Sequence, residues 1–312
     1  MIYARALTKT YGDVQAVKGI DLDIEAGESF GFLGPNGAGK STTMRMVAAV
    51  SPPGGGTLSI LGMDPATQGP AIRARLGVCP QEDTLDPELT ARENLTVYGR
   101  YFGLSRRECA SKADELLAFT SLTEKAASKT EALSGGMRRR LTIARSLIND
   151  PEVLLLDEPT TGLDPQARHL VWDRLFRLKQ SGVTLVLTTH YMDEAEQLCD
   201  RLVVIDQGVI VAAGSPRELI KEHSTREVAE LRFGTDDAPD GHEAIAAQHG
   251  DRLADLGERL EALPDRLLLY TDDGDAATAA LHERGLRPAS VLVRRSTLED
   301  VFLRLTGRTL VD

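Results

Sequence analysis

The stretch Gly34–Thr42 reads GPNGAGKST, and its glycine spacing indicates which fold to expect around it. It follows an apolar, strand-like segment, Ser29–Leu33, and opens a helical pattern that runs from Lys40 to Val50. Glycines at such a turn let backbone N–H groups point inward, and the helix N-terminus adds a partial positive charge. A glycine-rich turn that binds nothing is the alternative, but the full spacing in this context argues against it. The sequence therefore predicts a phosphate-binding loop (P-loop).

The side chains of this loop favour a nucleoside triphosphate bound with magnesium. Lys40 is placed to reach the terminal phosphates, and the hydroxyl group of Ser41 can coordinate Mg²⁺. Residues expected to contact the nucleotide are Gly34, Pro35, Asn36, Gly37, Ala38, Gly39, Lys40, Ser41 and Thr42.

A second apolar run ends in two adjacent acids. Val153–Pro159 reads VLLLDEP and places Asp157 and Glu158 at the carboxyl end of a buried strand, where ligands gather in open α/β sheets. We expect Asp157 to orient the magnesium shell and Glu158 to polarise the attacking water. A solvated acidic strand end is the alternative interpretation, which the upstream P-loop disfavours.

His190 follows VTLVLTT, a strand-like run without charge. Its imidazole could contact a γ-phosphate or hold the water that Glu158 activates. Taken alone, a single histidine of this kind is more often structural, so its role depends on the rest of the pattern.

The segment Leu133–Met137, LSGGM, begins a second helix with exposed backbone donors. Ser134 is its expected N-cap, and Gly135 and Gly136 leave N–H groups open, which makes a second anion-binding helix start. The chain has one P-loop, so this second surface has a use if it faces a nucleotide held by another copy. The arginines that follow, Arg138–Arg140, are expected to include at least two on a solvated flank.

Composition limits the classes of protein that fit. The chain has 312 residues and a formal net charge of −11, which argues against broad electrostatic attraction to nucleic acid or anionic lipid. Charges interrupt every apolar run before the ~18 residues that a membrane span needs. The first residues lack a secretory core, so we expect the protein to remain in the cytoplasm. Three scattered cysteines indicate reduced thiols.

The pattern of helices and strands predicts two domains. Short strands dominate as far as about Leu61, helices dominate over 83–150, and apolar strands then return. We place a boundary near residue 215, with domains at 1–215 and 216–312. The tail predicts a small ferredoxin-like α+β unit, with strands at Val228–Phe233 and Ser290–Val293, a hairpin between them, and helices at Glu243–Gln248, Ala276–Arg284 and Leu298–Leu305.

The order of these motifs resembles that of ABC transporter ATP-binding subunits. The resemblance covers about Tyr3 to Gly214 and implies that two subunits arranged head to tail clamp ATP between P-loop and signature helix. It assigns Tyr11 to stacking on adenine, Gln81 to the metal or the water, Asp164 to contact with the opposite subunit, and His190 to the γ-phosphate. Met137 stands where the family usually has Gln, and we expect little effect because Ser134 and the glycine amides supply the phosphate donors.

Three further segments narrow the resemblance to ABC-2-type exporters of the daunorubicin-resistance and nodulation-factor kind: RENLTVYGRYFGLS, DPQARHLVWDRL and STLEDVFLRLTGR. The implied fold is an α/β P-loop NTPase core with an antiparallel β subdomain, an inserted helical subdomain and a small C-terminal α+β domain. The implied partners are a second copy of the chain and a separate polytopic permease at the cytoplasmic face of a bacterial inner membrane. Together they would export a drug, lipid-linked or oligosaccharide-type compound.

The alternative is a non-transport ABC ATPase that acts in translation or DNA repair. Such relatives usually carry two cassettes in one chain or a long coiled coil inserted between P-loop and signature, and the sequence has neither. The basic surface of a nucleic-acid machine is also absent from the composition, so no nucleic-acid partner is expected.

Overall fold

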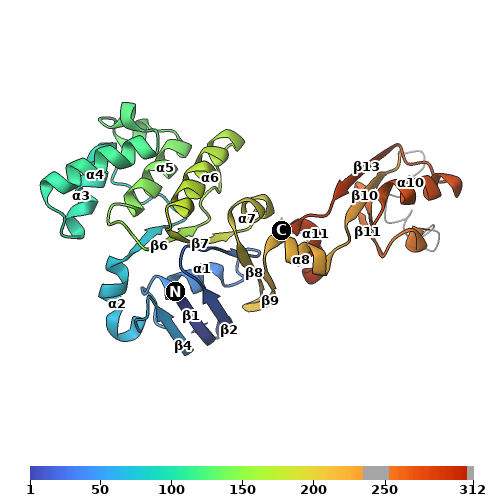
Figure 1. Ribbon diagram of the computed structural model, residues 1–312, viewed down its shortest axis with the longest axis horizontal. Helices are drawn as coiled ribbons and strands as arrows, with labels where there is room; N and C mark the ends of the chain where they lie inside the picture. The colour runs from blue at the N-terminus through green and yellow to red at the C-terminus, as the bar shows by residue number, and fades with distance from the viewer. Residues whose placement is uncertain (235–252, 308–312) are drawn as a thin grey trace. The chain divides into compact units, whose positions relative to one another are not determined.

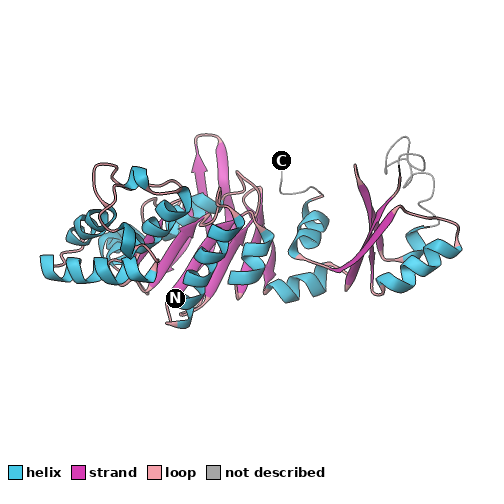
Figure 2. Ribbon diagram, turned by 90° about the horizontal axis from the view of Figure 1, so that it is seen from above, coloured by secondary structure: helices cyan, strands magenta, loops and turns pink. Residues whose placement is uncertain are grey.

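The computed structural model describes residues 1–234 and 253–307 (Figure 1). Contacts divide the chain into two compact units between Pro216 and Arg217, one residue beyond the boundary expected from the sequence. Figure 2 shows that both units combine helices with a sheet of their own. In the described ranges, no helix combines the length and the apolar character that a membrane crossing requires.

A six-stranded sheet forms the centre of the N-terminal unit. Its order is β5 (Leu76–Cys79), β6 (Val153–Asp157), β7 (Thr184–Thr189), β3 (Ser29–Leu33), β8 (Arg201–Asp206) and β9 (Val209–Gly214). Neighbouring strands pair in parallel except for the β8–β9 hairpin. Strands β3 and β7 are wholly buried, as their unbroken apolar runs predict. Since parallel strands share one direction, the loops that follow β3, β6 and β7 lie at the same edge.

Helices and a second sheet complete this core. Helices α1 (Lys40–Val47), α6 (Pro165–Gln180) and α7 (Met192–Leu198) follow β3, β6 and β7. The predicted antiparallel subdomain is confirmed as a sheet ordered β2 (Val14–Ile24), β1 (Ile2–Tyr11) and β4 (Gly55–Ile60), with α2 (Pro65–Ala74) after it. One hydrophobic core joins the two sheets, and it includes Leu7 of β1, Phe32 of β3 and Val186 of β7.

The three cysteines are free and buried, which agrees with reduced thiols. Burial raises the pKa of the thiols of Cys79 and Cys199 above the ordinary value, because a low-dielectric interior disfavours the thiolate.

The C-terminal unit contains a four-stranded antiparallel sheet. Its order is β11 (Arg259–Leu263), β12 (Arg266–Thr271), β10 (Glu227–Arg232) and β13 (Ser290–Arg295). The other elements in the described part of this unit are α8 (Pro216–His223), η3 (Ala254–Leu256), α10 (Gly274–Glu283) and α11 (Leu298–Thr306). Along the chain, β10 comes first, the β11–β12 hairpin follows, and α10 precedes β13. This order agrees with the ferredoxin-like unit expected from the sequence. The predicted helix Glu243–Gln248 lies outside the described residues.

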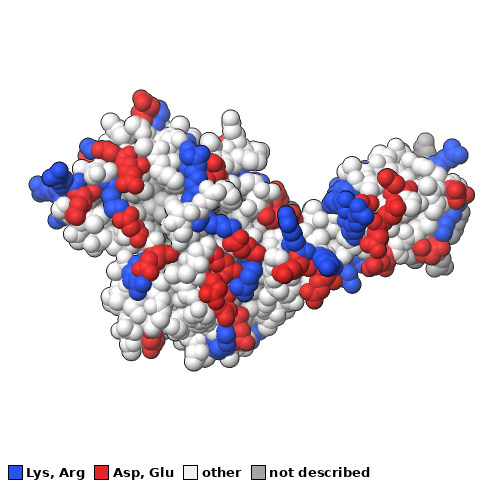
Figure 3. All heavy atoms as spheres, viewed as in Figure 1, with Lys and Arg blue, Asp and Glu red and all other residues white. Residues whose placement is uncertain are grey.

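An ion-pair network attaches α11 to one face of this sheet. The carboxylate of Glu230 accepts hydrogen bonds from Arg266 Nη1 at 2.8 Å and from Arg294 Nε at 2.7 Å. Arg294 Nη1 also donates to Asp300 Oδ2 at 2.7 Å, and Asp300 is only 1% exposed. The buried charges are therefore paired, as stability requires. On the face seen in Figure 3, acidic and basic side chains are intermixed over both units.

The inserted helical subdomain is confirmed in the N-terminal unit. Helices α3 (Ala91–Tyr101), α4 (Arg106–Phe119) and α5 (Gly135–Ser146) lie within the helix-rich region expected over 83–150, and the short η1 (Thr123–Lys125) and η2 (Thr130–Ala132) lie between α4 and α5. Capping boxes start α3 at Thr90 and α4 at Ser105. The three helices share a core that includes Leu95, Leu117 and Leu141.

Arg139 of α5 joins this subdomain to the central sheet. Its side chain is only 4% exposed, and Nε donates to the Pro159 carbonyl at 2.7 Å. Nη2 donates to the Asp157 carbonyl at 2.9 Å, and Nη1 donates to the Gln81 carbonyl at 3.2 Å. One guanidinium thus holds the backbone on both sides of the acidic strand end. Its neighbours Arg138 and Arg140 are partly exposed, so the solvated flank expected from the sequence is formed by these two arginines and not by Arg139.

The substitution Arg139→Met should lower the free energy of unfolding by about 3 kcal/mol, because it leaves several buried carbonyls without a donor. Arg138→Met is the matched control, and it should cost less than about 1 kcal/mol because that side chain is partly exposed. Urea unfolding followed by circular dichroism measures both. Equal losses for the two variants would show that Arg139 does not hold the subdomains together.

Candidate functional site

The P-loop closes around the N-terminus of α1. Gly39 caps this helix with φ +105, and a β-carbon built on it would lie 2.5 Å from the Ala16 carbonyl oxygen. A β-carbon on Gly34 would lie 2.2 Å from the Ile205 carbonyl oxygen. Both positions therefore require glycine. Gly39 needs it because of its positive φ and its close approach to Ala16, and Gly34 needs it because of its close approach to Ile205 alone. The result is a tight turn whose amides surround the start of a helix.

Lys40 is buried beneath this turn and is 4% exposed. Its Nζ donates to the carbonyl oxygen of Gly34 at 2.6 Å and to that of Pro35 at 3.0 Å. Burial lowers the pKa of the ammonium group below its ordinary value, while the nearby carboxylates of Glu158 and Asp157 oppose that shift. The cation is thus positioned at the P-loop and faces the acidic strand end.

Glu158 is the centre of the site. It is 6% exposed, and its backbone has φ +46, a left-handed conformation that is uncommon for a residue other than glycine. Its backbone N–H donates to the carbonyl oxygen and the Oγ1 of Thr188, at 3.1 and 3.0 Å, which holds this turn in place. The conformation aims the carboxylate at the P-loop instead of continuing the strand.

Four side chains surround the Glu158 carboxylate. Gln81 Nε2 donates to Oε2 at 2.9 Å, and Thr161 Oγ1 donates to the same atom at 3.1 Å. Oε1 lies 3.3 Å from His190 Nδ1 and 3.9 Å from Lys40 Nζ. The contact with His190 is the largest cause that lowers the pKa of this carboxyl, burial opposes the shift, and Lys40 and Thr161 contribute further lowering. Glu158 is therefore ionised at neutral pH.

Asp157 and Ser41 form the neighbouring oxygen-rich corner. Ser41 Oγ donates to Asp157 Oδ1 at 3.2 Å, and Thr188 Oγ1 donates to the same carboxylate oxygen. A hydroxyl, a carboxylate and the nearby Gln81 amide are the hard oxygen donors that Mg²⁺ prefers. The described residues contain no group of three or more His, Cys, Asp or Glu side chains suited to a metal.

The structure brings together the P-loop residues Gly34–Thr42, Gln81, the two acids and His190. Tyr11 lies at the end of β1, 46% exposed, with Lys9 Nζ 5.3 Å from its ring centroid. Since β1 leads directly into β2, and a β-carbon built on Gly39 would meet the Ala16 carbonyl of β2, this ring is on the strand pair next to the P-loop.

Ser134 and Asp164 are at exposed helix starts. Ser134 caps α5, and its Oγ accepts from the Met137 amide at 3.3 Å, which confirms the predicted N-cap. Nothing lies within 4 Å of a β-carbon built on Gly135, so the backbone of this turn is open to a ligand. Asp164 caps α6 by accepting from the Ala167 amide at 2.8 Å.

Three contributors were not foreseen from the sequence. Thr161 and Thr188 hold the acids, and Arg139 fixes the backbone beneath them. The only sequence signal for the threonines is their position, since Thr161 is three residues after Glu158 and Thr188 is two before His190. Arg139 carried no comparable signal, because its partners are far away in the sequence.

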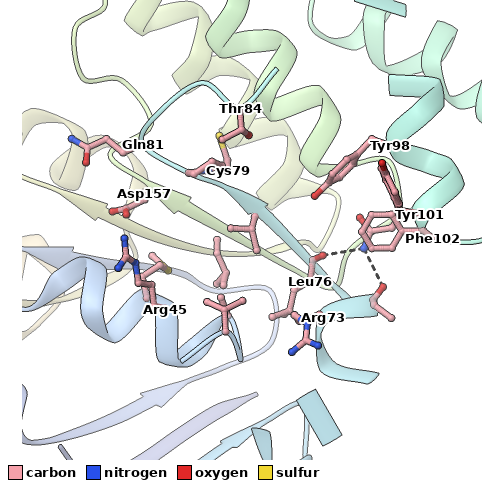
Figure 4. Close-up of a pocket in the computed structure, with 18 of the residues that line it drawn as sticks. Arg45, Arg73, Leu76, Cys79, Gln81, Thr84, Tyr98, Tyr101, Phe102 and Asp157 are labelled. Atoms are coloured by element: carbon pink, nitrogen blue, oxygen red, sulfur yellow. Dashed lines mark hydrogen bonds between the residues drawn. The ribbon is translucent and has the colours of Figure 1, made fainter. Parts of the chain in front are cut away.

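A cavity of about 980 Å³ opens beside the site, between the central sheet and the helical subdomain. One end is lined by Gln81 and Asp157, and the other by the aromatic rings of Tyr98, Tyr101 and Phe102 of α3 and its C-cap (Figure 4). Ser41, which is hydrogen-bonded to Asp157, also lines the cavity. Tyr101 is 80% exposed. The cavity therefore connects the acidic strand end with an apolar surface of the helical subdomain.

Comparison with known proteins agrees with this geometry. Residues 17–161 match the family described as ABC transporter, and residues 243–307 match the C-terminal domain of the nodulation factor export protein NodI. Solved structures similar to this chain include a dimeric ATP-binding cassette bound to ADP and Pi, with TM-score 0.64 and 30% identity over 69% of this chain and 98% of that one. Another is cbiO1 from Clostridium perfringens, with TM-score 0.66 and 28% identity over 71% and 90%.

Curated relatives match over nearly the whole chain. The Nod factor export ATP-binding protein I of Cupriavidus metallidurans is 46% identical over 100% of this chain and 99% of its own length. The protein of the same name from Paraburkholderia xenovorans is 48% identical over 97% of this chain and 96% of its own length. The fold is that of ABC ATPases, and the chain binds and hydrolyses ATP as the ATPase subunit of an exporter. The chain thus belongs to the Nod factor export ATP-binding protein I family of ABC transporter ATP-binding subunits.

Proposed function

We propose that residues 1–215 form the ATP-binding domain and residues 216–312 an accessory domain. The observation that carries the functional assignment is the environment of Glu158, whose ionised carboxylate lies among Gln81, His190 and Lys40. An ionised carboxylate held at the edge of a phosphate-binding loop can accept the proton of an attacking water.

Each site residue then has a role in phosphoryl transfer. The backbone N–H groups of Gly34–Gly39, apart from Pro35, and the Lys40 ammonium bind the phosphates, and Glu158 accepts the proton of the water. His190 orients that water or contacts the γ-phosphate, and Gln81 contacts the water or the metal. Tyr11 stacks on adenine. Since transfer depends mainly on position and charge, the fixed turn at Glu158 is the central requirement.

Magnesium would be held by Ser41 and Gln81, with Asp157 orienting its shell. The Ser41–Asp157 hydrogen bond of 3.2 Å supports this assignment, because it keeps the two oxygens close together. When bound, the ion neutralises charge on the phosphate oxygens. The chain's own task is to present hard oxygen donors next to the P-loop.

Glu158→Gln should retain ATP binding while lowering kcat for hydrolysis by roughly 10²–10⁴-fold, the scale expected for loss of a positioned base. Lys40→Ala should instead weaken nucleotide binding, because a buried cation at the P-loop is removed. A fluorescent ATP analogue measures binding, and phosphate release measures turnover. Near-normal turnover in the Glu158 variant would remove that residue from its role.

We further propose that the active unit is a homodimer with composite sites. The exposed start of α5 at Ser134 has open backbone donors, and the Asp164 turn at the start of α6 is equally exposed. In a two-fold pair, Ser134, Gly135 and Gly136 of one copy face the nucleotide on the P-loop of the other, and Asp164 contacts the opposite subunit. The dimeric cassette among the similar solved structures supports this arrangement.

Composite sites predict complementation between two inactive variants. Lys40→Ala disables the P-loop, and Ser134→Glu places a negative charge where the phosphates would bind. Dimers that contain one copy of each variant retain one intact site, so an equal mixture should recover roughly a quarter of wild-type turnover. Phosphate release before and after mixing measures the recovery. No recovery, in a mixture shown to exchange subunits, would contradict composite sites.

The cavity beside the site is a suitable docking place for a membrane permease. Its outer end presents the aromatic rings of Tyr98, Tyr101 and Phe102, while its inner end reaches Gln81. An apolar helix of a polytopic permease seated there would move with the helical subdomain as ATP is bound and released. We therefore place the protein peripherally, at the cytoplasmic face of a bacterial inner membrane.

Tyr101→Glu should reduce permease affinity by about 30-fold, the scale of a lost aromatic anchor, and leave the ATPase activity of the isolated chain unchanged. Tyr3→Glu is the matched control, because Tyr3 is exposed on β1, outside the cavity. Co-purification with the permease from detergent-solubilised membranes measures the association. Equal retention of both variants would place the permease elsewhere.

The relatives are named for Nod factor export. We infer that the complex exports a lipid-linked or oligosaccharide-type compound or a drug, and that the permease contacts this cargo. A role in translation or DNA repair has no support from these relatives.

A further inference from the structure

Glu194 is a fully buried acid that takes no part in the site described above. It lies on α7, four residues after His190, and is 0% exposed. Its Oε1 accepts two hydrogen bonds, from Thr160 Oγ1 at 2.8 Å and from Trp172 Nε1 at 3.2 Å. Burial raises the pKa of this carboxyl above its ordinary value, and its donor neighbours, led by Thr189, oppose that shift.

Each partner of Glu194 belongs to a segment that carries a site residue. Thr160 is two residues after Glu158, in the turn that follows β6. Trp172 lies on α6, the helix that Asp164 caps. Glu194 itself lies on the helix that directly follows His190. Glu194 Oε1 therefore links three segments: the turn that follows Glu158, helix α6 that follows Asp164, and helix α7 that follows His190.

A second contact links two of the same segments, helix α6 and the residues after His190. The guanidinium carbon of Arg168, on α6, lies 4.7 Å from the ring centroid of Tyr191, the residue after His190. The ring of His190 in turn lies 4.2 Å from that of Tyr191, centroid to centroid. The position of His190 is thus coupled to α6 through Tyr191 and to α7 through the backbone.

Burial of a carboxyl group is costly, and an apolar side chain of the same volume would avoid that cost but leave the Thr160 hydroxyl and the Trp172 N–H without their acceptor. Filling the space does not by itself need an acid. What the acid adds is an acceptor that two donors from different elements share. That shared acceptor fixes the Thr160 turn relative to α7, and so fixes Glu158 relative to His190.

We propose that Glu194 is a positioning residue for ATP hydrolysis, which holds the Glu158 carboxylate and the His190 imidazole at their 3.3 Å separation by accepting from Thr160 and Trp172. The proposal rests on the hydrolytic roles of Glu158 and His190. Glu194 acts through the turn that follows Glu158 and the helix that follows His190.

Glu194→Leu removes the acceptor at similar volume, and Glu194→Gln keeps an amide oxygen in its place. We expect the Leu variant to lower kcat by about 10–100-fold, the effect of a misplaced catalytic group, with KM for ATP unchanged within about twofold. The Gln variant should keep kcat within about threefold of wild type, because its carbonyl still accepts from both donors. Gln197→Ala, at an exposed position on the same helix, is the control and should leave kcat unchanged.

Steady-state phosphate release and binding of a fluorescent ATP analogue, on the full chain, measure these values. A Leu variant with wild-type kcat, or a Gln variant as impaired as Leu, would overturn the proposal. So would a parallel rise in KM, which would indicate general disruption of the domain. If Glu194→Leu does not fold, Thr160→Val removes one donor at nearly constant volume and should lower kcat by about 3–10-fold with unchanged KM. An inactive wild-type chain would refute the ATPase assignment itself, a separate outcome.

Discussion

Parallel pairing of β7 with both β3 and β6 is the constraint on which the rest of the site depends. It brings three carboxyl ends to one edge of the sheet, so the P-loop, the two acids and His190 meet although they are far apart in the sequence. The strands are buried on both faces, which makes a shift of register costly. The residues at the carboxyl ends of these strands can then adopt strained backbone conformations, such as the left-handed conformation of Glu158.

Much of the fold was accessible from local pattern. The helices of the inserted subdomain have clear capping signals and an apolar face, and the strands β3, β6 and β7 are short apolar runs bounded by turns. The sequence pattern predicts neither helix α2 nor strand β5, because Pro70 interrupts the helical pattern of α2 and β5 has only four residues. The helix predicted from Lys40 to Val50 ends earlier, at Val47.

The chemistry of the site was predictable to the extent that it lies in contiguous motifs. P-loop spacing and adjacent acids are local, so their residues could be named. Arg139 and Glu194 could not be, because their function depends on partners that only the folded chain brings close. An arginine within a run of three arginines in a helix usually lies on the exposed face of that helix, and an acid in a short helix usually lies on the surface. Both are buried here, which is the feature that distinguishes them.

The burial of Cys79, Cys109 and Cys199 has a practical consequence. Maleimide reagents need an accessible thiolate, and these sulfur atoms present none while the protein is folded. A cysteine introduced on the surface would therefore react alone, without first removing the native ones. Pairs of fluorophores could then be attached to the two units, and energy transfer between them would report how far apart they stand through the nucleotide cycle.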